Sequence, residues 1–181
     1  MNNDSKEVEM KGYWKVVITL FALAAVTGCF MFSPPKPPIT WDELQAKQEV
    51  TFGASFDLVW NSALVALSTQ KIEEIDKESG FITTREKNVS AKELDNYAWS
   101  PNYGSFWYYQ SNGAMDDARY WINLKVSALS EESTRVNITP NFEAHIREWA
   151  WDTASPMVWK TLRSRGVLED IIIGRITEGL D

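Results

Sequence analysis

ARYWINLKVS, residues 118–127, is the stretch of sequence that decides the fold. Apolar and polar side chains alternate along it, which is the period-two pattern of a β-strand with one buried face. The polar run Ser130-Glu131-Glu132-Ser133 predicts a turn, and Val136, Ile138 and Phe142 continue the buried face on a following strand. The stretch therefore predicts two neighbouring strands that cover a core on one side.

A second block of regular structure precedes these strands. Residues 50–54 predict a short strand, and Ser55 can cap the helix that follows, because its hydroxyl can accept an amide of the first turn. Residues 71–76 and 81–85 predict two further strands joined by a turn. The helix over residues 56–69 has one apolar stripe, with residues three and four positions apart: Phe56, Val59, Trp60, Ala63, Leu64 and Leu67.

A last helix is predicted over residues 167–179, with an apolar stripe made of Leu168, Ile171, Ile172 and Ile176. Residues 87–113 form a long aromatic-rich insertion, and residues 144–165 show no regular pattern. Each predicted strand has one apolar side and each helix one apolar stripe. We therefore expect an α+β domain, with an antiparallel sheet of four to five strands and two helices packed on one face.

The composition limits the classes of partner. The chain has a net charge of −7, with 25 acidic residues against 18 lysines and arginines. An acidic chain is repelled by nucleic-acid phosphates, and it has no basic cluster for anionic lipid head groups. We therefore expect neither a nucleic-acid partner nor electrostatic lipid binding.

The N-terminal segment predicts where the protein is located in the cell. Lys11 and Lys15 precede the uncharged residues 16–26, which have the length of a signal-peptide core. The run closes on Val26-Thr27-Gly28-Cys29, whose small residues before the only cysteine of the chain are typical of the cleavage and lipidation site of a bacterial lipoprotein. Cleavage after Gly28 would leave Cys29 as the acylated first residue.

This interpretation divides the chain into three parts: a lipoprotein signal peptide over residues 1–28, a lipidated cysteine with a proline-rich tether over 29–47, and a single α+β domain over 48–181. The prolines between residues 34 and 38 favour an extended spacer. No aspartate follows Cys29, which favours the outer membrane, with the domain facing the periplasm.

Two alternatives to a lipoprotein stay open. Residues 16–33 form an uncharged run of 18 residues, which is just long enough for an uncleaved inner-membrane signal anchor with an exported domain. Phe30-Met31-Phe32 prolongs that run past the proposed cleavage site. Cys29 could also be an ordinary buried thiol.

Three segments, 54–67, 72–76 and 80–84, carry a resemblance. Together they resemble the helix-grip domains of the C subunit of the outer-membrane β-barrel assembly machine, itself a lipoprotein. The resemblance covers about 35 residues and consists of one helix face and a turn glycine. It implies a helix-grip-like, tethered interaction domain and carries no catalytic residue across. The aromatic insertion departs from the pattern.

A search for catalytic chemistry centres on His145, the only histidine. Glu148 follows three residues later, and on a helix such a pair could bind a metal or relay a proton. One histidine with scattered carboxylates does not complete a zinc site, and no nucleophile has a second base beside it. We therefore predict no enzyme, no metal and no cofactor. His145 is predicted to be a solvated or hydrogen-bonded structural histidine, and a catalytic His145 is the alternative.

The best candidate for an interaction surface is the aromatic cluster, which we define as Trp99, Tyr103, Trp107, Tyr108 and Tyr109. These side chains offer large faces with a polar handle, which suits a protein interface or stacking on sugars. They could instead fill space beneath a long loop. The leading hypothesis is a non-catalytic lipoprotein acting as scaffold or adaptor for another cell-envelope protein; the alternative is a cell-wall glycan or small-ligand binding module.

Overall fold

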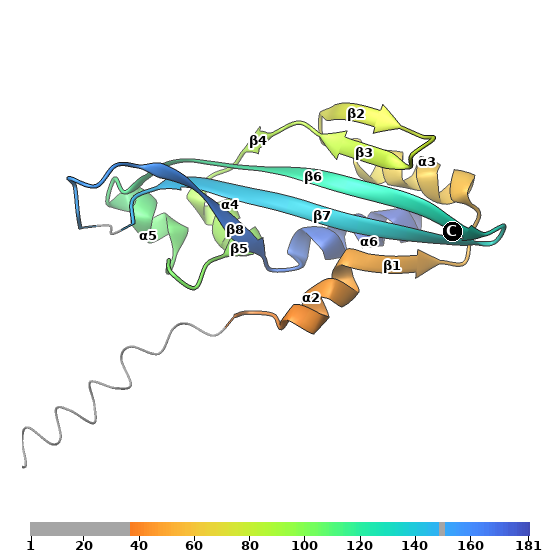
Figure 1. The fold of residues 1–181 in the computed structure, drawn as a ribbon, viewed down its shortest axis with the longest axis horizontal. Helices are drawn as coiled ribbons and strands as arrows, with labels where there is room; N and C mark the ends of the chain where they lie inside the picture. The colour runs from red at the N-terminus through yellow and green to blue at the C-terminus, as the bar shows by residue number, and fades with distance from the viewer. Residues whose placement is uncertain (1–36, 149–150) are drawn as a thin grey trace, which may run out of the picture. The chain divides into compact units, whose positions relative to one another are not determined.

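The structure, a computed structural model, describes residues 37–148 and 151–181. Its longest elements are the antiparallel strands β6 (Met115–Ser130) and β7 (Ser133–Ile146), shown in Figure 1. Tyr120 pairs with Phe142, and Leu124 pairs with Ile138. Alternate residues of both strands are buried. The two strands predicted on either side of the turn at residues 130–133 are therefore confirmed.

Six shorter strands flank this hairpin, and all of their pairings are antiparallel. β3 and β4 pair with β6, and β2 pairs with β3. β1 and β8 pair with opposite ends of β7, and β5 pairs with β8. The strands are β1 (Glu49–Phe52), β2 (Ile72–Asp76), β3 (Phe81–Thr84), β4 (Lys87–Asn88), β5 (Ala98–Trp99) and β8 (Val158–Ser164).

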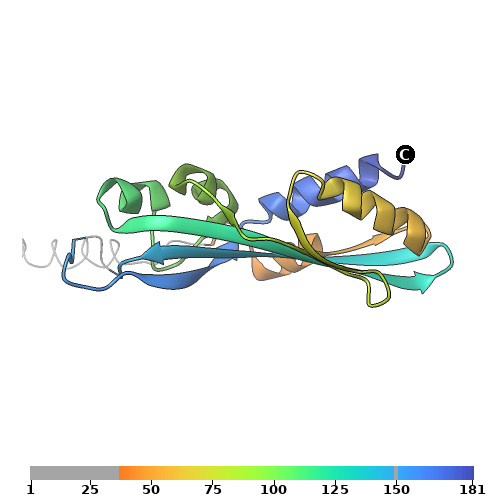
Figure 2. The same ribbon diagram turned by 90° about the horizontal axis from the view of Figure 1, so that it is seen from above.

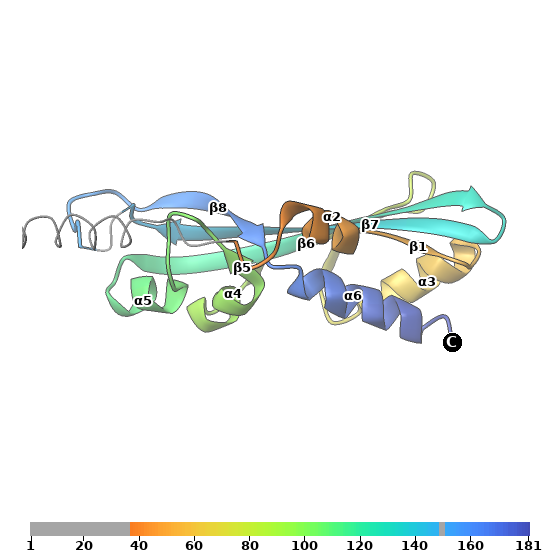
Figure 3. The same ribbon diagram turned by 90° about the horizontal axis from the view of Figure 1, so that it is seen from below.

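Pro140 lies where the sheet is divided on the β7 side. β1 pairs with β7 up to Asn137 and β8 pairs with it from Phe142 onward, so no described strand covers residues 138–141 on that side. Proline has no amide hydrogen to donate, and it is tolerated where a strand has an open edge. Helix α2 (Trp41–Gln48) contacts β7 and lies between β1 and β8 in Figures 1 and 3.

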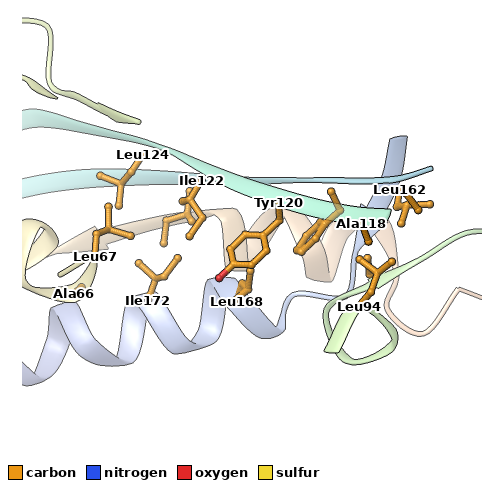
Figure 4. Packing of buried hydrophobic residues seen from close by; sticks show 14 of the residues in the cluster. Ala66, Leu67, Leu94, Ala118, Tyr120, Ile122, Leu124, Leu162, Leu168 and Ile172 are labelled. Carbon is orange, nitrogen blue, oxygen red and sulfur yellow. The ribbon is translucent and has the colours of Figure 1, made fainter. Parts of the chain in front are cut away.

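Four other helices cover one face of the sheet, as Figures 2 and 3 show. They form two contacting pairs, one towards each end of the hairpin. The first pair is α3 (Phe56–Ala66) with α6 (Val167–Glu178), and the second is α4 (Ala91–Tyr97) with α5 (Phe106–Ser111). Both pairs contribute to one hydrophobic cluster against the buried face of β6 and β7 (Figure 4).

The predicted helix-grip-like arrangement, with a sheet of four to five strands and two helices on one face, is wrong. The sheet has eight strands, and the described residues form five helices. The class, α+β with an antiparallel sheet, is confirmed. β4 and β5 have two residues each, too few to show a period, and they form because β6 and β8 present edges to them. β8 lies within residues 144–165, where no regular pattern was found, and α4 and α5 lie within the predicted insertion at residues 87–113.

The predicted stripes on α3 and α6 are largely confirmed. Val59, Ala63 and Leu67 are fully buried, as is Ile176 on α6. Ile171 is the exception: it remains 38% exposed, because it lies on the side of α6 away from the sheet. Ser55 stands at the N-cap of α3 as predicted, but its side chain makes no capping hydrogen bond.

Gly80 explains the tight turn between β2 and β3. Its φ is +76°, and a Cβ added there would lie 2.1 Å from the carbonyl oxygen of Val126. The Gly80 carbonyl also accepts a hydrogen bond from the Val126 amide, at 2.8 Å. Only glycine permits this approach of the turn to β6 without moving backbone.

Helix α2, the first helix in the described residues, contacts the beginning of α6. Thr40 and Glu43 form a capping box at the start of α2. At its other end, Lys47 forms an ion pair with Asp170, and the Gln48 amide donates to the carboxylate of Glu169 at 3.2 Å. Most of α2 lies within residues 29–47, the range predicted as tether, so this range contains a folded helix that packs on the domain.

Candidate functional site

Residues 87–113, predicted as an insertion, fold into a compact unit of α4 and α5 beside β5. α4 begins at Ser90, whose hydroxyl accepts the backbone amide of Glu93 at 3.3 Å. The Glu93 carboxylate in turn accepts the Ser90 amide at 3.1 Å. This reciprocal capping box satisfies two donors that the first turn of a helix otherwise leaves unpaired. Ala91 and Leu94 are then buried in the core.

Asp95 on α4 determines where α5 begins. One of its carboxylate oxygens accepts the Phe106 amide at 2.7 Å, and the other accepts the Trp107 amide at 3.2 Å and the Ser105 hydroxyl at 2.7 Å. The N-cap residue Ser105 makes no capping bond of its own. A carboxylate at the N-terminus of a helix satisfies its free amides and complements its partial positive charge. Asp95 thus supplies the cap of α5 from a neighbouring helix.

The structure separates the aromatic cluster into two groups. Trp99, Tyr103 and Tyr109 are buried, with exposed fractions of 8%, 6% and 9%. Trp107 and Tyr108 are exposed, at 59% and 54%. Only this second group, which we call the α5 aromatic pair, offers whole faces to a partner. The buried group matches the interpretation in which some of these rings fill space beneath a loop.

The buried rings support the exposed pair. Tyr109 packs edge-on against Tyr103, with 5.4 Å between ring centroids, and against Tyr108 at 6.0 Å. Phe106 is 1% exposed and anchors α5 in the core. Aromatic pairs of this edge-to-face geometry add specific attraction to the burial of their area. The backbone and the neighbouring rings together hold Tyr108 in place.

The exposed side of α5 is uncharged. Its six residues, Phe106–Ser111, include no charged side chain. Exposed neighbouring tryptophan and tyrosine residues on a firmly capped helix lose little conformational freedom on binding, and they are the residue types that dominate interface energetics. The site can therefore contribute non-covalent binding by apolar contact and by the phenol and indole hydrogen-bonding groups.

A cavity of about 350 Å³ lies beside Tyr103. Its lining residues come from the segments that follow β5 and β7 and from β8: Ser100, Asn102, Tyr103, Glu148, Lys160 and Thr161. Tyr103 is the member of the aromatic cluster that lines this cavity. The other lining side chains are polar or charged.

The predicted lipidation site lies outside the described residues. This applies to Val26, Thr27, Gly28 and Cys29, and equally to the anchor predicted over residues 16–33. In the part of the chain that the structure describes, no helix is both long and apolar enough to cross a membrane.

His145 lies on β7 and not on a helix, so its predicted helical spacing to Glu148 does not apply. Its Nδ1 is 2.7 Å from a carboxylate oxygen of Asp116, and its ring packs against Trp159 at 5.1 Å. Within residues 37–148 and 151–181, no three histidine, cysteine or acidic side chains gather closely enough to hold a metal ion. The contacts of His145 match its predicted structural role.

A charged network around Arg119 was not predicted. Arg119 donates to Glu143 at 2.7 and 3.0 Å and to Glu86 at 2.8 Å, and the Glu143 bonds raise the pKa of its guanidinium. The guanidinium also lies 4.1 Å from the ring centroid of Trp159. The network occupies the sheet face away from the helices, where Arg119 pairs with Glu143. A count outward from Ser130 opposite Ser133 would place Arg119 opposite Ala144, because it misses the register shift between Ala128 and Ser130 that brings Glu143 opposite Arg119.

Replacing Asp95 by alanine should loosen α5. The variant loses three hydrogen bonds at one helix start, and removal of a cap costs about 1–2 kcal/mol in free energy of unfolding. Asp95→Asn should lose less, because an amide oxygen can still accept. Urea unfolding gives the stability, and hydrogen exchange at the Phe106 and Trp107 amides gives the local effect. Behaviour identical to that of Glu73→Ala, an exposed acid on β2, would contradict this role of Asp95.

Comparison with known proteins finds no family model that matches this chain and no curated protein that matches it. The resemblance to helix-grip domains of an assembly-machine lipoprotein therefore stays a prediction.

Proposed function

We propose that this chain is a non-catalytic, membrane-tethered lipoprotein that acts as a scaffold or adaptor for another cell-envelope protein. The observation that carries the proposal is the α5 aromatic pair: Trp107 and Tyr108 are exposed on an uncharged, firmly capped helix. Solitary exposed apolar residues are ordinary, whereas neighbouring ones on a rigid element suit a binding surface.

The second support is the N-terminal sequence. Val26-Thr27-Gly28-Cys29 closes an apolar run and precedes prolines, the arrangement that attaches an exported domain to a membrane by acyl chains. A tethered domain meets membrane partners at high local concentration, so a modest interface suffices for binding. On this proposal the domain faces the periplasm from the outer membrane, and Cys29 is a point of attachment without catalytic chemistry.

The proposed absence of catalysis rests on the sequence. A single histidine and a single cysteine leave few general bases and nucleophiles. The contacts of His145 with Asp116 and Trp159 give it a structural task on the sheet. The burial of Tyr103 and Tyr109 likewise gives those tyrosines packing roles, which leaves Trp107 and Tyr108 for the partner.

Removing the α5 aromatic pair should abolish partner binding while the fold survives. The bait is the full chain, anchored through Cys29 and crosslinked in intact envelopes. Trp107→Ala combined with Tyr108→Ala should weaken recovery of a specific partner about 30-fold or more, the effect expected when interface hot spots are lost. Trp41→Ala, which removes another exposed tryptophan, is the matched control. Equal recovery by the double variant and the wild type would remove α5 from the interface.

Acylation of Cys29 is tested separately. Cells that express the wild-type chain should incorporate a fatty-acid label into it, and Cys29→Ser should incorporate none, because only a thiol forms the thioether to the lipid. Gel mobility should show the loss of residues 1–28 in the wild type alone. An unlabelled wild-type chain of full length would contradict the lipoprotein proposal in favour of the signal anchor.

A further inference from the structure

The cavity of about 350 Å³ beside Tyr103 has a chemical character that differs from the α5 aromatic pair. Its lining combines one cation, Lys160, one anion, Glu148, and neutral hydroxyl and amide groups. Among the described lining residues, Tyr103 supplies the ring. A lining of this kind rejects an apolar ligand, because its polar groups would lose water without gaining hydrogen bonds. It suits a small ligand with no net charge and several hydrogen-bonding groups.

The two charges in this lining are available to a ligand. Among the described residues, neither Lys160 nor Glu148 forms an ion pair, although both border the same space. Their charged atoms therefore stand more than 4.0 Å apart. A ligand with a negative group at one end and a positive group at the other can form a charge-assisted hydrogen bond with each of these two side chains. Such bonds are stronger than the neutral ones that water offers.

The wall formed by β8 adds backbone hydrogen-bonding groups. β7 pairs with one edge of β8 from Val158 to Leu162, whereas β5 covers the other edge only at Arg163 and Ser164. Along the rest of that second edge the structure describes no partner strand. Alternate residues of such an edge direct N–H and C=O groups outward, and a peptide backbone complements them. This edge favours a peptide over a sugar.

Tyr103 also lines this space. Burial, together with the nearby Tyr109 and Glu148, holds the pKa of its phenol above the ordinary value. The hydroxyl therefore stays protonated and can donate to a carbonyl or a carboxylate. In the same lining, the Ser100 hydroxyl accepts the backbone amide of Asn102 at 3.2 Å, which orders the segment after β5.

We propose that this cavity binds a short peptide with free termini, its carboxylate at Lys160, its amino group at Glu148 and its backbone along the open edge of β8. This ligand site goes beyond the adaptor role and uses none of the exposed residues on which that role rests. Peptide binding can therefore fail while partner binding through Trp107 and Tyr108 survives, and the reverse also holds.

The test uses the full chain and four probes in calorimetric titrations: the dipeptide Ala-Ala, its N-acetyl form, its C-terminal amide and N-acetylglucosamine. Ala-Ala should bind saturably, and blocking either terminus should weaken binding about tenfold or more, because a charge-assisted hydrogen bond is lost. N-acetylglucosamine should not bind. No saturable binding of Ala-Ala, or equal binding of the blocked forms, would overturn the proposal, as would N-acetylglucosamine binding in place of Ala-Ala.

Two variants assign the termini. Lys160→Met should bind Ala-Ala weakly, and amidation should then cost nothing further. Glu148→Gln should behave in the same way towards N-acetylation. Lys92→Met, at an exposed position on α4, is the control and should bind as the wild type does. Both side chains lie at the surface of the cavity, so these variants should keep the fold, as urea unfolding can verify. Unchanged discrimination between free and blocked termini in both variants would contradict the assignment.

Discussion

The pairing of β6 with β7 is the constraint on which the rest of the structure depends. The two strands keep one register from Asp117 opposite His145 to Ala128 opposite Thr134, with a register shift at each end, and every flanking strand except β2 and β5 pairs directly with one of them. The inward side chains of this hairpin run beneath both helix pairs (Figure 4). A slip of one residue would turn the whole apolar set of each strand away from the core.

The helices at the two ends of the hairpin are stabilised in different ways. At the end near its turn, α3 and α6 pack on it with apolar stripes that a helical period makes visible in the sequence. At the other end, α4 and α5 have only seven and six residues, and they depend on side-chain caps from Ser90, Glu93 and Asp95. Pro140 lies between the ends, where the division of the sheet between β1 and β8 leaves its missing amide without consequence.

The long elements could be predicted from the sequence, because a buried face repeats along them. The strands around Tyr120 and Ile138 and the helices at Val59 and Ile176 show this clearly. β4, β5 and β8 could not, because the first two contain two residues each and β8 has a mostly exposed start. The aromatic cluster could be found by composition alone. Its separation into buried Tyr103 and exposed Trp107 could not, because it depends on the Asp95 cap of α5. That cap joins residues 95 and 106 across a segment without periodicity. The cavity beside Lys160 could not be predicted either, because it depends on the placement of β8.

Native-state hydrogen exchange with Ile122→Val tests the central role of the hairpin most directly. Ile122 is 1% exposed at the middle of β6, and the loss of one methyl group should cost about 0.5–1.5 kcal/mol without unfolding the chain. If β6 and β7 hold both ends together, the slowest amides of the α3–α6 pair and of the α4–α5 pair should accelerate by the same factor. Acceleration confined to one helix pair, with the other unchanged, would show that the two ends are stabilised independently and would contradict the account.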